Sequence, residues 1–329
     1  MNITDILQSL AGRYVTQSFL HAFIAVIITD GALRAWKIED PAVKQRFRIL
    51  TVLFPIFSFP FYQLINPDRG SLLFRTGALF DSGRWMGMAL FGVVPLHFFF
   101  LFLLAGTTLV FFFQELVPIL KHMRESDTEV DEACDPAGKD LVDEALMSLP
   151  MARPRTVIID DGDMVLFSST GRAPTVFVSS GLLQALNREQ VRAALAHEIA
   201  HIMRSRRPIL LATFLLRMIM FFNPMVLVEF RRAVRNEEKI CDDIAVSVTG
   251  RPDALAETLK KFYSSPGRSP DAAKKLLSTD VPLEEYSHDL QLESRITRLE
   301  KAGLKNRGGG WFPFTIVLLV MSAVCYFVV

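Results

Sequence analysis

Residues 187–202 read NREQVRAALAHEIAHI, and this stretch decides what kind of domain the chain contains. Asn187 can cap a helix, and Gln190 three residues later completes a capping-box pattern. Apolar residues then recur at helical spacing, at Val191, Leu195, Ile199 and Ile202. The stretch therefore predicts a helix with a well-defined start.

Three residues with metal and proton chemistry, His197, Glu198 and His201, lie inside this predicted helix. The two histidines are four residues apart, so their imidazoles project from one face and can close on a single zinc ion. Glu198 beside them can take a proton from an attacking water and pass it to the leaving amine of a peptide. The HExxH pattern also arises by chance in roughly one of every hundred chains of this length, so a third ligand matters.

A second predicted helix, residues 231–248, offers that ligand, because a catalytic zinc needs three protein ligands and one open position. Its acidic residues are Glu237, Glu238, Asp242 and Asp243. Glu238 and Asp242 are four apart, so one can bind zinc while the other accepts a hydrogen bond from a ligating histidine. The alternative is a solvent-facing acidic patch. Cys241 is interpreted as a small buried residue rather than a ligand.

The composition places much of the chain in a membrane. Half of the 329 residues are apolar and 27 are Phe, in a few long runs. The net charge of +1 argues against nucleic acid as a partner. The three cysteines show no CxxC pair, so we expect neither a disulfide framework nor a cysteine-rich zinc site. We also expect no cleavable signal peptide.

Four stretches approach the ~20 apolar residues that a bilayer core requires. They are residues 14–33, 47–65, 88–116 and 311–329. The loop after the first stretch is cationic, which places it in the cytoplasm, with Arg34, Lys37, Lys44, Arg46 and Arg48 against Glu39 and Asp40. We therefore predict a multi-pass protein of a cell membrane, in keeping with a bacterial inner membrane. Both termini then face outward.

Three regions follow: spans in residues 1–118, a cytoplasmic domain in residues 119–310 and a last span in residues 311–329. The domain begins with an acidic stretch interpreted as a solvated face. A small sheet is expected from β-rich runs at residues 156–159, 164–167 and 175–178. The apolar stretch 209–230 contains Asn223-Pro224, which predicts a hairpin, either dipping into the membrane or buried in the domain.

Residues 174–248 resemble the membrane-bound zinc peptidases of the BlaR/MecR antirepressor type, relatives of the HtpX and CAAX prenyl protease group. The shared features are PTVFVSSGLL, HEIAH, FFNP and an ExxCD motif, in that order. The resemblance implies an α+β gluzincin-type protease domain with one zinc ion. It implies that His197, His201 and Glu238 bind the zinc, that Glu198 is the general base, and that Asp242 supports a ligand.

Two departures from this family matter. The antirepressor transducers continue into an external β-lactam-binding domain, whereas this sequence stops at Val329, so we expect no sensor of its own. HtpX-like relatives carry His-Pro followed by Arg-Ile, which hold substrate or the oxyanion. Here His288-Asp289 and Arg295-Ile296 are similar without the proline, so His288 and Arg295 are catalytic candidates, with exposed helix residues as the alternative. The run 175–180 is predicted as a sheet edge to which substrate adds.

These observations predict a membrane-embedded zinc metalloendopeptidase that cleaves a cytosolic or membrane-proximal protein in regulatory signalling, with a separate sensor or repressor protein as a partner. Clearance of damaged membrane proteins, as in HtpX, is the nearest alternative. A catalytically silent, zinc-bearing signalling scaffold is an alternative of another class. A transporter ranks below these, because intramembrane charges are sparse and no repeat symmetry is visible.

Overall fold

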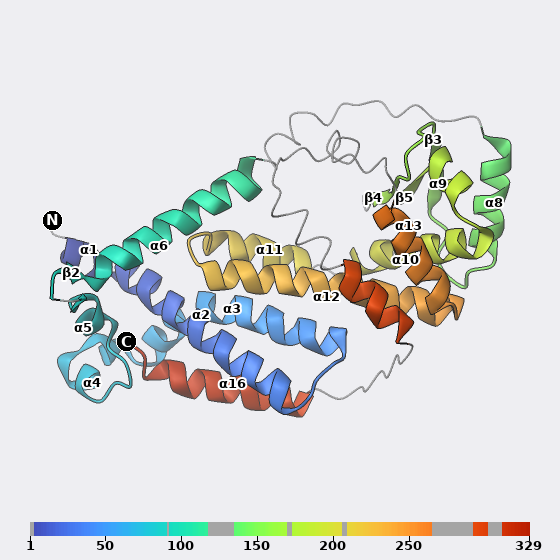
Figure 1. Ribbon diagram of the computed structural model, residues 1–329. Coiled ribbons are helices and arrows are strands. Elements are labelled where there is room, and N and C mark those ends of the chain that lie inside the picture. Colours follow the sequence, from blue (N-terminus) through green and yellow to red (C-terminus); the bar gives the residue numbers. More distant parts are fainter. Residues whose placement is uncertain are drawn as a thin grey trace. The chain divides into compact units, whose positions relative to one another are not determined.

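The computed structural model describes residues 3–90, 92–117, 135–169, 173–205, 209–264, 292–301 and 311–329. The chain divides into two compact units, which are described separately (Figure 1). Unit 1 comprises Met1–Phe113, Ile209–Glu237 and Asn306–Val329. Unit 2 comprises Gln114–Pro208 and Glu238–Lys305. Helix α12 (Pro224–Thr249) contributes to both units.

Unit 1 contains three helices long and apolar enough to cross a membrane: Leu10–Ala35, Pro41–Ile65 and Leu96–Gln114. They correspond to α2 (Leu10–Ala35), α3 (Pro41–Ile65) and α6 (Leu96–Phe111), the last continued by the π-helical turn η2 (Phe112–Leu116). The fourth predicted span contains α16 (Trp311–Tyr326), an apolar helix of 16 residues.

The predicted start of the third span, at Met88, is wrong. Short strands β1 (Ala89–Leu90) and β2 (Val94–Pro95) pair there as an antiparallel hairpin, and α6 begins only at Leu96. Gly92 has a φ of 73°, a turn conformation that favours glycine. Apolar content alone did not separate this hairpin from a membrane helix.

The helices of unit 1 pack through apolar and aromatic side chains. Helix α2 lies against both α3 and α16 (Figure 1). Phe47 and Phe54 of α3 and Met321 of α16 are buried in the shared core. Four short helices complete the unit: α1 (Ile3–Gln8), η1 (Pro67–Gly70), α4 (Leu72–Thr76) and α5 (Ser82–Met86).

A cluster of four charged residues is neutralised within unit 1. Asp30 of α2 lies 2.6 Å from Arg48 of α3, and Arg48 also donates to Glu229 of α12 over 2.8 Å. Arg232 reaches both carboxylates, at 3.2 Å from Asp30 and 2.7 Å from Glu229. An unpaired buried charge would cost several kcal/mol, so the pairing explains how these helices tolerate the charges. The assignment of Arg48 to a loop is wrong, because it lies inside α3.

The predicted hairpin at 209–230 is formed by α11 (Ile209–Ile219) and the start of α12. Asn223 caps α12 by accepting a hydrogen bond from the Met225 amide over 3.1 Å, and Pro224 occupies its first turn. Helix α11 packs on α3, while Leu211 and Leu215 are exposed. The segment Ile209–Glu237 groups with unit 1, which contains the long apolar helices, and not with unit 2.

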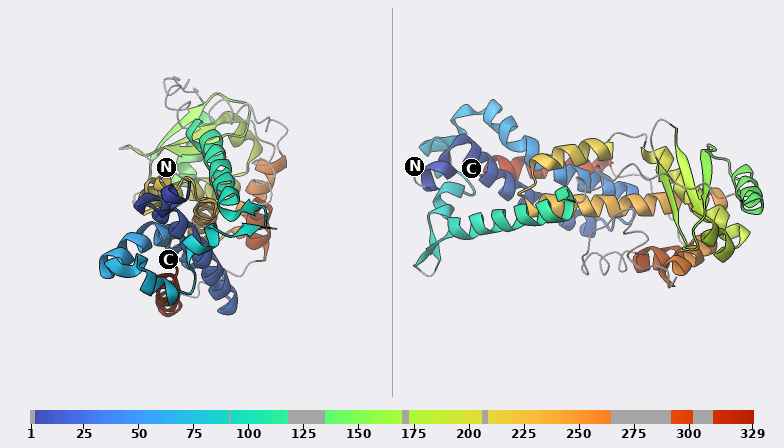
Figure 2. Two further views of the ribbon diagram at one scale, coloured as in Figure 1. Left: turned by 90° about the vertical axis from the view of Figure 1, so that its left-hand side faces the viewer. Right: turned by 90° about the horizontal axis from the view of Figure 1, so that it is seen from above.

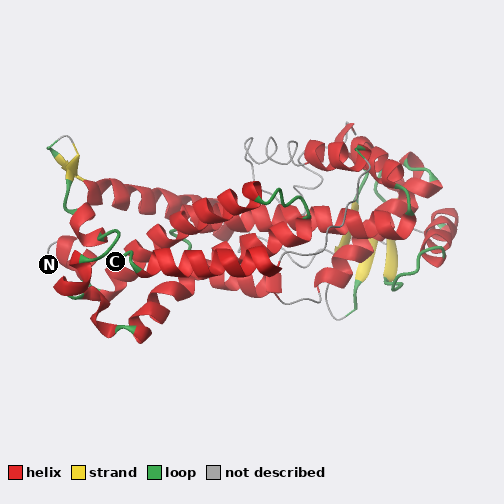
Figure 3. Ribbon diagram, turned by 90° about the horizontal axis from the view of Figure 1, so that it is seen from below, coloured by secondary structure: helices red, strands yellow, loops and turns green. Residues whose placement is uncertain are grey.

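Unit 2 combines helices with a three-stranded sheet, shown with its strands side by side in the right-hand view of Figure 2. The helices are α8 (Pro136–Met147), α9 (Ser180–Ala185), α10 (Arg188–Ser205), the end of α12, α13 (Pro252–Ser264) and a helical segment at residues 292–300. In Figure 3 the strands of unit 2 are confined to this one sheet. Val176, Val178, Leu195 and Ile199 lie in its buried core.

The strand order corrects one prediction. The strands are β3 (Arg155–Ile159), β4 (Leu166–Ser169) and β5 (Thr175–Ser179), arranged β3–β5–β4. Strand β5 pairs in parallel with β3 and antiparallel with β4, so it is central and cannot accept a substrate strand. The prediction of an edge at 175–180 is therefore wrong. Strand β4 packs near α10 and, within the described residues, pairs only with β5.

The start of α10 agrees with its sequence pattern. The Gln190 amide donates to the Asn187 side chain over 2.9 Å, and the Gln190 side chain accepts from the Asn187 amide over 3.1 Å. This reciprocal pair is the predicted capping box. It fixes where the helix begins, and hence which face its later residues present.

Candidate metal centre

Two helices of unit 2 bring three ligand-type side chains together. His197 and His201 lie one turn apart on α10, and Glu238 lies on α12. The Nε2 atoms of the two histidines are 3.0 Å apart. The Glu238 carboxylate oxygens lie 3.7 Å from His197 Nε2 and 3.5 Å from His201 Nε2. The fold thus brings the ligand atoms of Glu238 close to those of two histidines that lie about forty positions earlier in the sequence.

These spacings fit a tetrahedral zinc ion. With ligand atoms about 2.0–2.1 Å from zinc, the edges of a tetrahedron are about 3.3 Å long. The three donor separations of 3.0, 3.5 and 3.7 Å lie around this value. Two imidazoles and one carboxylate are also a donor set typical of catalytic rather than structural zinc sites.

The three side chains are partly accessible. His197 is nearly buried, whereas 26% of the His201 side chain and 33% of the Glu238 side chain are exposed. An enclosed triad would have no room for a substrate carbonyl. The exposure of His201 and Glu238 leaves an approach for a fourth group, as a hydrolytic site requires.

Asp242 lies behind the triad, one turn after Glu238 on α12. Its Oδ1 atom is 3.1 Å from Nδ1 of His197, the ring nitrogen on the side away from the triad. A carboxylate that accepts a hydrogen bond from Nδ1 can fix which nitrogen carries the proton and make the other a better ligand. Burial opposes the charge of Asp242, but contacts with His197 and Arg295 lower its pKa to about 2. Asp242 is therefore an anion.

The triad is coupled electrostatically as well. Burial alone would lower the pKa of His197, but contacts with Asp242 and Glu238 outweigh burial and raise that pKa to about 9. Burial would likewise raise the pKa of Glu238, but the two imidazoles hold it far below its ordinary range.

Arg295 joins the same cluster from the helical segment 292–300. Its guanidinium makes two hydrogen bonds to Asp242, at 2.8 and 2.7 Å, and one to Glu238, at 3.0 Å. The side chain is 13% exposed, so the exposed-helix alternative is wrong. Burial opposes its charge, but Asp242 and Glu238 more than compensate, and the pKa of Arg295 is raised. Its guanidinium also lies 3.4 Å from Nε2 of His197, so Arg295 contacts Asp242 and two members of the triad, which indicates a positioning role.

Replacing Arg295 with Lys tests this role. Lys keeps the charge but cannot make the two-pronged contact with Asp242, so the orientation of His197 loses support. We expect zinc affinity to fall about 10–100-fold, the range for changes to such outer partners. The measurement is competition with a chelator of known affinity.

Arg298 provides a matched control, because it lies one turn away and donates to Asp243 over 2.7 Å, outside the triad. Arg298→Lys should leave zinc affinity unchanged. Equal losses in both variants would show that only the packing of this helical segment matters.

The remaining candidates are placed as follows. Glu198 follows His197 on α10, is partly exposed, and has no hydrogen bond or ion pair with another described residue. Its carboxylate is thus available to a water or substrate. His288 lies outside the described residues. Cys241 is buried, with its sulfur 3.5 Å from Nδ1 of His201, so it does not join the three ligand atoms.

The contact of Cys241 with His201 is a feature that the sequence reasoning missed. The sulfur of Cys241 lies at Nδ1 of His201, as Oδ1 of Asp242 lies at Nδ1 of His197. The sequence did carry a signal, because Cys241 lies three residues after Glu238 and shares its helix face. As a lone Cys on a helix, Cys241 is expected from the sequence only to be a small buried residue.

Comparisons with known proteins find similarity to peptidases. Residues 167–268 match the family model described as "BlaR1 peptidase M56". A "Protease HtpX homolog" of Streptococcus pyogenes serotype M49 (strain NZ131) is 30% identical over 162 residues, which cover 48% of this chain and 47% of the relative. The "Protease HtpX homolog" of Streptococcus pyogenes serotype M1 matches to the same extent.

The chain spans about half the length of the curated relatives it matches. The family model includes α10 and the whole of α12, whereas Arg295 lies beyond it. Together with the apolar helices, they support a membrane metallopeptidase of the M56/HtpX type.

Proposed function

We propose that the chain is a zinc metalloendopeptidase of the cell membrane, which cleaves a cytosolic or membrane-proximal protein in regulatory signalling. The observation that carries this proposal is the convergence of His197, His201 and Glu238 on one point, with Glu198 adjacent on the same helix. A structural zinc site needs the three ligands and a fourth, but has no use for an available glutamate beside them.

Each residue has a defined part in this reaction. Zinc held by His197, His201 and Glu238 would supply a Lewis acid that polarises the peptide carbonyl and acidifies a water. Glu198 accepts the proton of the attacking water and returns it to the leaving amine. Asp242 and Arg295 keep the first histidine oriented, so that the geometry is ready before substrate arrives.

The free edge of β4 is the proposed docking place for substrate. An extended peptide can add to a sheet edge through main-chain hydrogen bonds, without a fixed sequence. Strand β4 packs near α10, the helix that carries His197 and Glu198. This arrangement replaces the docking on residues 175–180 that the sequence predicts, because β5 is already paired on both sides.

The positive-inside rule supports a multi-pass protein with its active site on the cytoplasmic side. Among the flanking cations, Arg34 and Lys37 lie at the end of α2, and Lys44 and Arg46 lie in the first turns of α3. A cytoplasmic site gives access to cytosolic proteins. A repressor protein, released by cleavage, and a separate sensor are the proposed partners.

Two alternatives lead to different outcomes. The similarity to proteins named "Protease HtpX homolog" favours clearance of damaged membrane proteins as a second function. The silent scaffold would be supported by a fourth protein ligand such as Cys241. Among the described residues, the cysteine contacts the far side of His201 instead, which weighs against a closed site.

The proposed function is tested with the full chain purified in detergent. We expect one zinc per chain by elemental analysis, cleavage of an unfolded reporter protein, and loss of cleavage with a chelator that zinc restores. A chain that holds one zinc and cuts neither this reporter nor any protein of its own membranes would favour the scaffold.

Substrate trapping separates regulation from quality control. A Glu198→Gln variant in native membranes should retain bound substrate, which can be identified after cross-linking. One or a few regulatory proteins would support signalling, whereas a broad set of misfolded membrane proteins would support quality control.

A further inference from the structure

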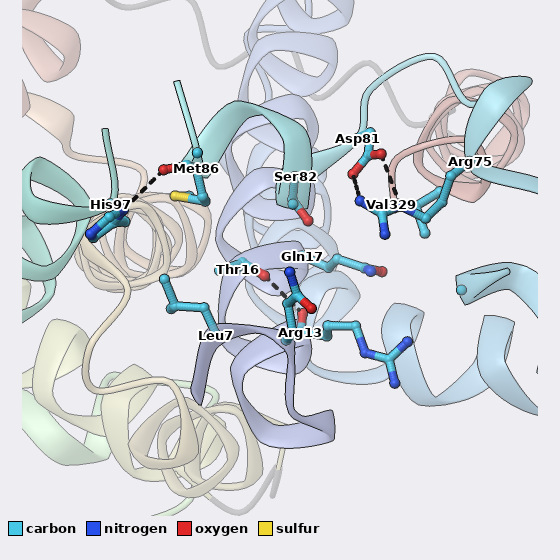
Figure 4. Close-up of a pocket in the computed structure, with 14 residues that line it drawn as sticks. Leu7, Arg13, Thr16, Gln17, Arg75, Asp81, Ser82, Met86, His97 and Val329 are labelled. Carbon is cyan, nitrogen blue, oxygen red and sulfur yellow. Dashed lines mark hydrogen bonds and ion pairs between the residues drawn. The ribbon is translucent and has the colours of Figure 1, made fainter. Parts of the chain in front are cut away.

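A second site candidate lies within unit 1 and involves none of the metal-centre residues. It is a pocket of about 360 Å³ between the start of α2, the segment around α5, the start of α6 and Val329 (Figure 4). The volume falls at the small end of the range for small-molecule sites. Five segments distant in the sequence meet around it, so the pocket is built by the tertiary fold.

Arg13 is the charged side chain of this pocket that lacks a partner. Its Nε atom is buried, and its guanidinium makes no hydrogen bond or ion pair with a described residue. A buried donor without an acceptor costs about 1–3 kcal/mol, and more when it is charged. The natural partner for a guanidinium is a phosphate or carboxylate, which can take two parallel hydrogen bonds.

Two glycines make room for the arginines of the pocket. A Cβ atom on Gly70 would lie 2.4 Å from Nη1 of Arg13, and one on Gly83 would lie 2.8 Å from Nη2 of Arg75. Both distances are shorter than real contacts, so a larger residue at either position would displace the guanidinium beside it. The backbone at Gly70 and Gly83 thus lies close to the guanidinium groups of Arg13 and Arg75.

The other polar groups leave the pocket cationic and rich in donors. Asp81 is occupied, because Arg75 makes two hydrogen bonds to it, at 2.8 and 2.9 Å (Figure 4). Gln17 accepts from the buried Arg69 over 2.9 Å, which leaves its amide hydrogens as donors. Among the described side chains of the lining, Asp81 is the one carboxylate, and it pairs with Arg75 rather than with Arg13.

Neighbouring side chains indicate the depth of this pocket in the membrane. Helix α4 has only five residues, so it cannot span, yet Leu72 and Leu73 are 82% and 86% exposed. Short helices that expose apolar residues beside polar ones lie in the headgroup layer. Arg75, on the same helix, lines the pocket. Phosphate groups of lipids are the anions that are concentrated at this level.

We propose that this pocket binds the phosphate of a small glycerophosphate group through Arg13, with Gln17 as a second donor. The phosphate comes either from a lipid headgroup or from a soluble molecule. The proposal is independent of proteolysis, since it concerns a site in unit 1 whose residues are absent from the metal centre.

The experiment measures binding to the full chain, purified in detergent and freed of lipid. One arm titrates glycerol 3-phosphate, with glycerol as the phosphate-free control. The other titrates short-chain phosphatidylglycerol, with short-chain diacylglycerol as its control. We expect saturable binding that Arg13→Gln weakens about 10–100-fold, the effect of losing a charged hydrogen bond. Arg34→Gln, on the exposed surface of the same helix, should bind as the unaltered chain does.

Binding of both phosphate ligands assigns the site to a soluble phosphate, and binding of the lipid alone assigns it to a headgroup. No phosphate-dependent binding in either arm, or equal binding by Arg13→Gln, would overturn the proposal. If Arg13→Gln does not fold, Arg13→Lys replaces it, because Lys keeps the charge and loses the two-pronged geometry. Unchanged affinity in that variant, with unchanged unfolding temperature, would also contradict the assignment.

Discussion

Replacing Glu198 with Gln should lower the rate of peptide cleavage by about 10²–10⁴-fold, the usual contribution of a general base. The amide has the size of the carboxylate but cannot accept the proton of the attacking water. Zinc content should stay at one per chain, because Glu198 is not among the three clustered ligand atoms. The measurement pairs single-turnover cleavage of a reporter protein with elemental analysis of the same sample.

The matched control is Glu189→Gln, in the first turn of the same helix, where the carboxylate is 3.9 Å from Arg192 and far along the helix from the histidines. It should cleave at the normal rate. Undiminished cleavage by Glu198→Gln would refute the assigned base. Loss of zinc in that variant would mean that Glu198 holds the metal, and the ligand set would have to be revised.

Replacing Glu238 with Gln should remove the metal itself. Structural zinc sites with four ligands bind with about 10–16 kcal/mol, so one ligand contributes roughly 3–4 kcal/mol. The expected loss of zinc affinity is therefore about 10²–10³-fold, with cleavage falling in parallel at limiting zinc. Neutralisation of the carboxylate is the cause, because an amide oxygen is a much weaker zinc ligand.

Glu237→Gln separates a ligand effect from a general effect on α12. Glu237 accepts a hydrogen bond from Gln45 and is not among the three clustered ligand residues. This variant should keep full zinc affinity. Retention of zinc by Glu238→Gln, together with its loss in Asp242→Asn, would exchange the roles of the two acidic residues.

Glu198→Gln and Glu238→Gln distinguish loss of the general base from loss of bound zinc. Glu198→Gln should yield a loaded but inactive protein, whereas Glu238→Gln should yield an inactive protein that recovers with excess zinc. The silent scaffold predicts no cleavage by the unaltered chain in either comparison, so the same samples test that alternative.

Local spacing predicted much of the metal centre. His197 and His201 share a helix face because four residues make about one turn, and the capping box fixes where α10 begins. Glu238 and Asp242 share a face of α12 for the same reason. Their spacing alone did not decide whether Glu238 or Asp242 is the third metal ligand. The resemblance to the peptidase family assigned that role to Glu238. Among the described residues, three of the four predicted spans contain helices long and apolar enough to cross a membrane, and the fourth contains the shorter apolar helix α16. The start predicted at Met88 is wrong, because that part of the apolar stretch forms a β-hairpin.

Long-range packing decided the rest. Strand β5 is central because β3 and β4, both earlier in the chain, pair on either side of it, and no alternation pattern records strand order. Arg295 meets Asp242 across more than fifty residues, and Arg48 meets Glu229 across a still greater separation. The lining of the pocket around Arg13 comes together in the same way.

By itself, then, the sequence determined the apolar helices, the HExxH helix and the acidic pair on α12, because each depends on interactions within a few turns of one element. The tertiary structure alone decided the point on which His197, His201 and Glu238 converge, the carboxylate clamp of Arg295 and the free edge of β4. Among the described strands, β4 lies at one end of the sheet, so its edge position, like the other two features, depends on how elements pack. Packing is set by the summed fit of many side chains rather than by any one period in the sequence.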